Sequence, residues 1–176
     1  MEKYITSFLD QSDIDAILSQ VNNIKSTLET VIWDEDSGEP EIIFREANKI
    51  INNTSLGKIT FDIELPTNIK EKISNTAKEM GINGKFFRAA YCEYSPKWGK
   101  PRLVSHKDPI DLLIIDYQLD GTTTWDLVID DKTYTLKNND ALAFFPARQQ
   151  HGRPQKDFKN YEYVAVLFLD LQILND

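Results

Sequence analysis

The chain has 176 residues, of which 41% are apolar, so it has the length and the apolar content of one ordinary domain with one core. Its formal net charge of -8 argues against a nucleic acid as the main partner, because proteins that bind long polyanions usually carry a net basic footprint. The sequence has no apolar run of about 18 residues, no apolar leader with a basic flank, and a single cysteine, Cys92. We therefore expect one cytoplasmic domain, residues 1–176, with no membrane segment.

The first half of the chain shows helical periodicity in two places. Apolar residues fall on one helical stripe over 13–32 and again over 66–80, so we predict two amphipathic helices there. Residues 58–64 alternate as a strand does, whereas 41–51 fit either period. We expect residues 1–84 to form a helical support region. Whether it supplies a substrate lid or a dimer surface stays open, and with it the oligomeric state.

The second half of the chain consists of short β segments separated by turn signals. Closely spaced strands with polar turns favour a sandwich or barrel, and helices that precede strands without βαβ alternation argue against a parallel doubly wound sheet. We expect an α+β, mainly β fold in which a β core over 85–171 carries the N-terminal helices on its outside. The predicted strands are 86–94, 103–108, 112–119, 125–129, 132–136, 141–145 and 161–171.

Both histidines of the chain lie in this β-rich half. His106 and Asp108 are separated by one residue in a predicted strand, so both side chains point to the same face. His151 follows after enough chain for several strands to return. Two imidazoles and one carboxylate can occupy one face of a six-coordinate metal and leave three positions open, which is the geometry of non-haem iron(II) oxygenases. Taken singly, each is more simply an inert polar residue at a strand end, but the spacing of the three together favours a metal site.

These motifs resemble the 2-oxoglutarate- and iron(II)-dependent oxygenases, especially the prolyl-hydroxylase-like branch and small stand-alone relatives from microbes and phages. The resemblance covers about residues 86–170: a tyrosine-containing strand precedes His106-Lys107-Asp108, and a turn and strand over 139–145 precede His151. It implies a double-stranded β-helix, a jelly-roll or cupin-like barrel. It further implies that the three residues hold catalytic Fe(II), that 2-oxoglutarate chelates the iron, and that O2 takes the last position. The reaction then hydroxylates a substrate and releases succinate and CO2.

The resemblance also implies a cation for the far carboxylate of 2-oxoglutarate, since paired charge-assisted hydrogen bonds suit that group. The family usually places this residue on the strand after the distal histidine, but the predicted strand 161–171 contains no basic residue. Arg153, two residues after His151, is our first candidate and Lys159 the second. Tyr94 occupies the place where relatives direct a tyrosine hydroxyl at the cosubstrate.

Two other functions fit the same residues. A cupin-like metalloprotein would use the three ligands without 2-oxoglutarate, and replacement of Arg153 and Lys159 would distinguish it from the oxygenase. A non-catalytic β-barrel module would bind a ligand with no metal or a structural one, although a structural zinc site normally has four protein ligands. The substrate, a small molecule or a protein side chain, is not readable from the sequence, because loops determine that choice.

Overall fold

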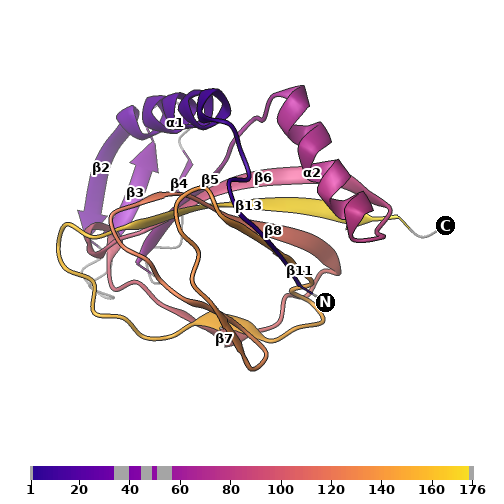
Figure 1. The fold of residues 1–176 in the computed structure, drawn as a ribbon. Helices are drawn as coiled ribbons and strands as arrows, with labels where there is room; N and C mark the ends of the chain where they lie inside the picture. Colours follow the sequence, from indigo (N-terminus) through magenta and orange to yellow (C-terminus); the bar gives the residue numbers. More distant parts are fainter. Residues whose placement is uncertain (1, 34–39, 45–48, 51–56, 175–176) are drawn as a thin grey trace.

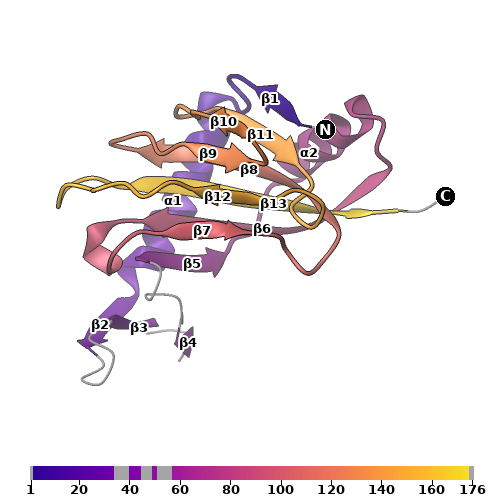
Figure 2. The ribbon, with the colours of Figure 1, turned by 90° about the horizontal axis from the view of Figure 1, so that it is seen from below.

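Two antiparallel sheets form the body of the protein, which a computed structural model describes over residues 2–33, 40–44, 49–50 and 57–174. Figure 1 shows the larger sheet in the middle of the molecule, with the helices on one side and β7 of the smaller sheet on the other. Figure 2, seen from below, shows the smaller sheet lying across the larger one. Two facing antiparallel sheets of this kind confirm the predicted mainly β, jelly-roll-like architecture.

The larger sheet has six strands and the smaller has four, and every pairing is antiparallel. In spatial order the larger sheet contains β1 (Lys3–Ile5), β11 (Ala141–Phe144), β8 (Leu112–Gly121), β13 (Val164–Ile173), β6 (Gly84–Tyr94) and β5 (Lys58–Asp62). The smaller sheet contains β10 (Lys132–Tyr134), β9 (Leu127–Ile129), β12 (His151–Arg153) and β7 (Leu103–His106).

Each face of the larger sheet has its own role. On β8 and β13, Ile115 and Leu167 belong to the main apolar core beneath the helices. Their neighbours Asp116 and Phe168 alternate to the opposite face and line a cavity between the sheets. The outer face therefore holds the helices, and the inner face is available for a site.

Helices α1 (Gln11–Ser26) and α2 (Thr67–Glu79) cover the outer face of the larger sheet (Figure 1). Ile17 of α1 and Ile73 of α2 are buried in the main core, as their positions on an apolar stripe predict. The predicted helix over 66–80 is confirmed: Pro66 stands before its first turn, and Gly81 beyond its end has a left-handed φ of 73°. Neither helix is long and apolar enough to cross a membrane, and the described residues hold no other candidate.

The predicted helix over 13–32 is wrong in its last turn and a half. The helix ends at Ser26, and β2 (Leu28–Trp33) follows. Thr30, Val31 and Ile32 are β-branched and therefore prefer an extended backbone, and β2 pairs with β3 (Pro40–Phe44). The ambiguous stretch 41–51 contains the rest of this small sheet, β3 and β4 (Lys49–Ile50), while residues 45–48 and 51 lie outside the described residues.

All seven strands predicted for the second half are present, with ends shifted by a few residues. The sequence did not reveal β12, whose three residues His-Gly-Arg are too few to show a period. Residues 1–84 contribute more than helices, because β1 and β5 extend the larger sheet at its two edges.

Truncation of the core beneath α2 tests this arrangement. Ile73 is fully buried, so Ile73→Ala should lower the free energy of unfolding by about 2–5 kcal/mol through lost burial and the cavity left behind. Val104 is 70% exposed, so Val104→Ala should change it by less than about 0.5 kcal/mol. Urea denaturation of both variants measures the difference. Equal effects would show that α2 does not pack on the sheet as described.

Candidate metal centre

The pairing of β12 with β7 brings the two histidines together. The strands are antiparallel neighbours, and His151 lies directly opposite His106. Pairing of β12 with β9 fixes its other side, so His151 is held between two strands. Asp108 lies just beyond the end of β7, where its backbone N–H donates to the Pro146 carbonyl at 3.0 Å. The carboxylate thus comes from a loop held against the segment that leads into β12.

The three side chains that the sequence singled out meet at one point. Asp108 Oδ1 lies 3.3 Å from His106 Nε2 and 3.7 Å from His151 Nε2. The two imidazole ring centres are 4.3 Å apart, and one donor atom from each of the three residues lies within 4.8 Å of the others. Such a set of two nitrogens and one oxygen fits around a single divalent ion. It is the one group of three potential ligands found among the described residues.

Backbone carbonyls orient both imidazoles through their Nδ1 atoms. His106 Nδ1 lies 2.8 Å from the Val104 carbonyl, and His151 Nδ1 lies 3.2 Å from the Gln149 carbonyl. A carbonyl only accepts, so Nδ1 carries the proton and Nε2 keeps its lone pair. Burial lowers the pKa of His151 and so favours its neutral form. Both tautomer and charge therefore suit a metal ligand.

Gly152 lets the two strands approach each other, a role that the sequence reasoning missed. A Cβ atom added there would lie 2.8 Å from Ser105 Cα and 2.9 Å from Ser105 N. These are backbone atoms of β7, so they could not move aside without moving the strand. A glycine inside a strand often marks such a close backbone approach, and this was the available signal.

The group of His106, Asp108 and His151 opens onto a cavity of about 190 Å³ between the two sheets. Its wall is apolar on several sides, while charged residues reach it from β5, β6, β8 and β13. The described residues that line it beside the three candidate ligands are Lys58, Arg88, Tyr94, Leu103, Ile114, Asp116, Leu127, Phe144, Phe168 and Asp170.

Of the three residues predicted to bind the cosubstrate, Tyr94 lines the cavity, whereas Arg153 and Lys159 do not. The buried hydroxyl of Tyr94 has no regular hydrogen-bond partner among the described residues, and its one polar neighbour is the Cys92 thiol, a weak hydrogen-bonding group. Arg153 is also buried, but it lies behind the wall: Nη2 donates to Asp116 Oδ2 at 3.1 Å and Nη1 donates to the Trp125 carbonyl. Lys159 is exposed in the loop before β13 and does not line the cavity.

Burial and Arg153 shift the pKa of the Asp116 carboxyl group in opposite directions. Burial raises the pKa of Asp116, and the neighbouring guanidinium of Arg153 opposes this shift. Because both side chains are almost wholly inaccessible, loss of either partner would leave an uncompensated polar group in the barrel. The pair is therefore part of the structure of the barrel wall.

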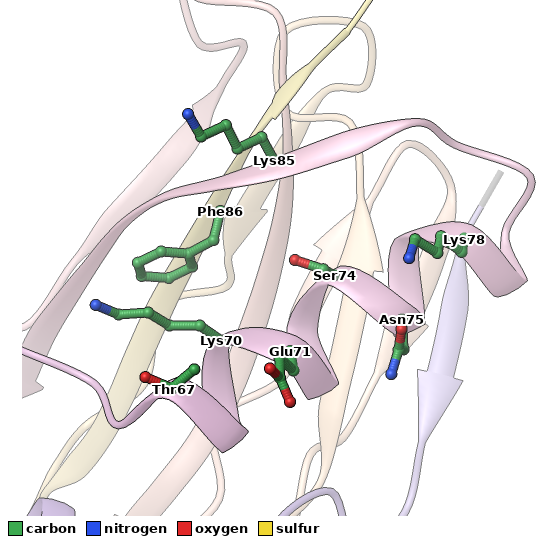
Figure 3. A pocket seen from close by; sticks show the side chains of 8 residues that line it. All are labelled: Thr67, Lys70, Glu71, Ser74, Asn75, Lys78, Lys85 and Phe86. Carbon is green, nitrogen blue, oxygen red and sulfur yellow. The ribbon is translucent and has the colours of Figure 1, made fainter.

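A wider hollow of about 600 Å³ lies on the other side of the larger sheet, between α2 and β6 (Figure 3). Figure 3 shows the Lys70 side chain alongside the Phe86 ring, and Lys70 Nζ lies 5.5 Å from the ring centre. The hollow has no histidine or cysteine in its wall, so it is not a second metal centre of this type. Its lining residues are Thr67, Lys70, Glu71, Ser74, Asn75, Lys78, Lys85 and Phe86.

Fold and site together define a double-stranded β-helix protein with a two-histidine, one-carboxylate candidate metal centre between its two sheets. No family model matches the sequence, and no curated protein matches it. The fold nevertheless matches solved structures over nearly the whole chain.

Three solved structures illustrate the match, and two of them are prolyl hydroxylases by name. AviO1 from Streptomyces viridochromogenes Tue57 superposes with a TM-score of 0.62 at 10% identity, covering 97% of this chain and 88% of that one. A prolyl-4-hydroxylase from Pseudomonas putida gives 0.57 at 10% identity, with 96% and 91% covered. A prolyl hydroxylase from Trichoplax adhaerens, in complex with a hypoxia inducible factor peptide fragment, gives 0.55 at 13% identity, with 96% and 82% covered. This chain shares the fold of these proteins.

The close approach at Gly152 gives a test of the site's geometry. Gly152→Ala should push β12 away from β7, separate the two histidines and weaken Mn(II) binding by roughly tenfold or more. Electron paramagnetic resonance titration of free Mn(II) measures the affinity. Gly84→Ala is the matched control, because an added Cβ there would make ordinary contacts of 3.4 Å and longer. Wild-type affinity in Gly152→Ala would contradict the described strand pairing.

Proposed function

We propose that the protein is an Fe(II)- and 2-oxoglutarate-dependent oxygenase that hydroxylates its substrate and releases succinate and CO2. The observation that carries the proposal is the meeting of His106, Asp108 and His151 on the cavity between the two sheets, a set that would leave one face of a bound ion free. The shared fold of prolyl hydroxylases and the resemblance of residues 86–170 to this oxygenase family support the same reaction.

In this proposal each side chain has a definite task. His106, Asp108 and His151 bind the ion from one side, and the carbonyls behind the two imidazoles keep Nε2 directed at it. Bound Fe(II) with 2-oxoglutarate supplies the activation of O2. Phe144 and Phe168 give the cavity next to the ligands an apolar wall.

Tyr94 is proposed to donate a hydrogen bond to 2-oxoglutarate. Burial holds the pKa of its hydroxyl well above the ordinary value, so the group stays protonated and acts as a donor. Among the described residues its hydroxyl has no hydrogen-bond partner, so it can donate to a carboxylate oxygen.

The substrate is proposed to be a small molecule or a protein side chain that approaches from outside the barrel. The side chains of His106 and Asp108 are 40% and 31% exposed, so the ion would be reachable from solvent. The Trichoplax adhaerens prolyl hydroxylase, which has this fold, is described in complex with a peptide. A side chain on a protein loop is thus compatible with the open face of this site.

A second candidate is a cupin-like metalloprotein that uses the same ligands without 2-oxoglutarate. One observation favours it: Arg153, our first candidate for the carboxylate anchor, is already engaged by Asp116, and β13 carries no basic residue. A non-catalytic β-barrel module remains the third reading and requires no catalytic metal.

Anaerobic titration distinguishes these functions. Fe(II) and then 2-oxoglutarate are added to the purified apo-protein, and the absorbance of the weak visible charge-transfer band of the iron chelate is recorded. We expect the band in the wild type and its loss in His106→Ala and His151→Ala, because each removes an Nε2 ligand. Asp131→Ala, at an exposed turn, is the control that should keep the band.

Two other outcomes would decide against the proposal. If iron binds but the charge-transfer band does not form, 2-oxoglutarate is not the cosubstrate and the cupin-like function is supported. Failure to bind iron at all would exclude both metal-dependent functions.

A further inference from the structure

Among the described residues that line the cavity beside the candidate ligands, one cation has no acidic partner. Two basic residues line it, Lys58 and Arg88. Arg88 is paired with the buried Asp170, at 2.8 Å from Nη2 and 3.0 Å from Nε to the same carboxylate oxygen. The side-chain ammonium of Lys58, in contrast, forms no ion pair or hydrogen bond with any residue of the described part of the chain.

Strand pairing places Lys58 on the inner face of the barrel. On β5 it lies opposite Tyr94 of β6, which in turn lies opposite Val164 of β13. The Lys58 ammonium lies 5.5 Å from the centre of the Tyr94 ring, so its stem follows the face of that ring. Lys58 and Tyr94 therefore line the same cavity from neighbouring strands, and the buried Tyr94 hydroxyl has no hydrogen-bond partner among the described residues.

The charges around the cavity suit a ligand with two negative charges. Arg88 neutralises Asp170, and Arg153 neutralises Asp116 from behind the wall. Asp108 faces the metal position and reduces the charge of a divalent ion by one. Lys58 adds one positive charge, so a loaded cavity would carry two unbalanced positive charges. A keto acid with a second carboxylate would balance both, one at the metal and one at the ammonium.

We propose that Lys58 binds the far carboxylate of 2-oxoglutarate, with the Tyr94 hydroxyl as a second donor. This inference rests on the proposed function and deepens it, because it identifies the cation that the strand after His151 does not supply. Lys58 enters from an N-terminal strand, at the edge of the larger sheet. Arg153 then has a structural role as the partner of Asp116.

Calorimetric titration of Mn(II)-loaded protein with 2-oxoglutarate, without O2, tests the assignment. Lys58→Met should weaken 2-oxoglutarate binding by about 10- to 100-fold, the loss expected for a hydrogen bond to a charged group, and should leave Mn(II) affinity unchanged. Lys58→Arg should restore most of the affinity, because it keeps the charge. Lys159→Met is the matched control and should bind as the wild type does.

A truncated ligand separates a direct contact from a structural effect. The keto acid 2-oxopentanoate has the same chelating end and no far carboxylate, so Lys58→Met and the wild type should bind it equally. If Lys58→Met weakens both ligands alike, or neither, Lys58 does not contact the far carboxylate and the inference is wrong. In that case the wild type still binds 2-oxoglutarate in a metal-dependent way and the proposed function stands. Absence of 2-oxoglutarate binding in the Mn(II)-loaded wild type would overturn both.

Discussion

The antiparallel pairing of β12 with β7 is the constraint on which the site depends. It sets His151 opposite His106, and a shift by one residue would turn one imidazole to the other face of the sheet. The pairing is close because Gly152 has no side chain, and β9 holds the far edge of β12. The larger sheet and its helices provide the rigid support against which this short strand is fixed.

The inside of the barrel is unusually charged for a space between two sheets. Asp116 and Asp170 are buried with one carboxylate oxygen each unpartnered, and burial raises the pKa of both. Buried carboxylates lower stability unless they are paired. Arg153 pairs with Asp116 and Arg88 pairs with Asp170, from two different strands. The two ion pairs leave Lys58 as the unbalanced cation of the cavity wall. The polar interior thus indicates a site built for a charged ligand.

The sequence predicted the parts of this structure that depend on local pattern. The alternating strands, the helix over 66–80 and the spacing of His106 and Asp108 all follow from periods that a short window reveals. Long-range pairing could not be read in this way. Residues 28–33 form a strand because they pair with β3, and the three residues of β12 form one because they pair with β7. Arg153 is not free for a ligand, because the fold places it beside Asp116. Lys58 escaped notice because only the fold brings β5 beside Tyr94.

The central claim is that two imidazoles and one carboxylate of this chain hold a single iron ion. X-ray absorption spectroscopy at the iron edge of the Fe(II)-loaded protein tests it most directly, because ring carbons of bound imidazole give a characteristic outer-shell scattering. We predict scattering from two imidazoles per iron in the wild type and from one in His151→Ala. An iron shell without imidazole scattering, or the same spectrum in both proteins, would contradict the account.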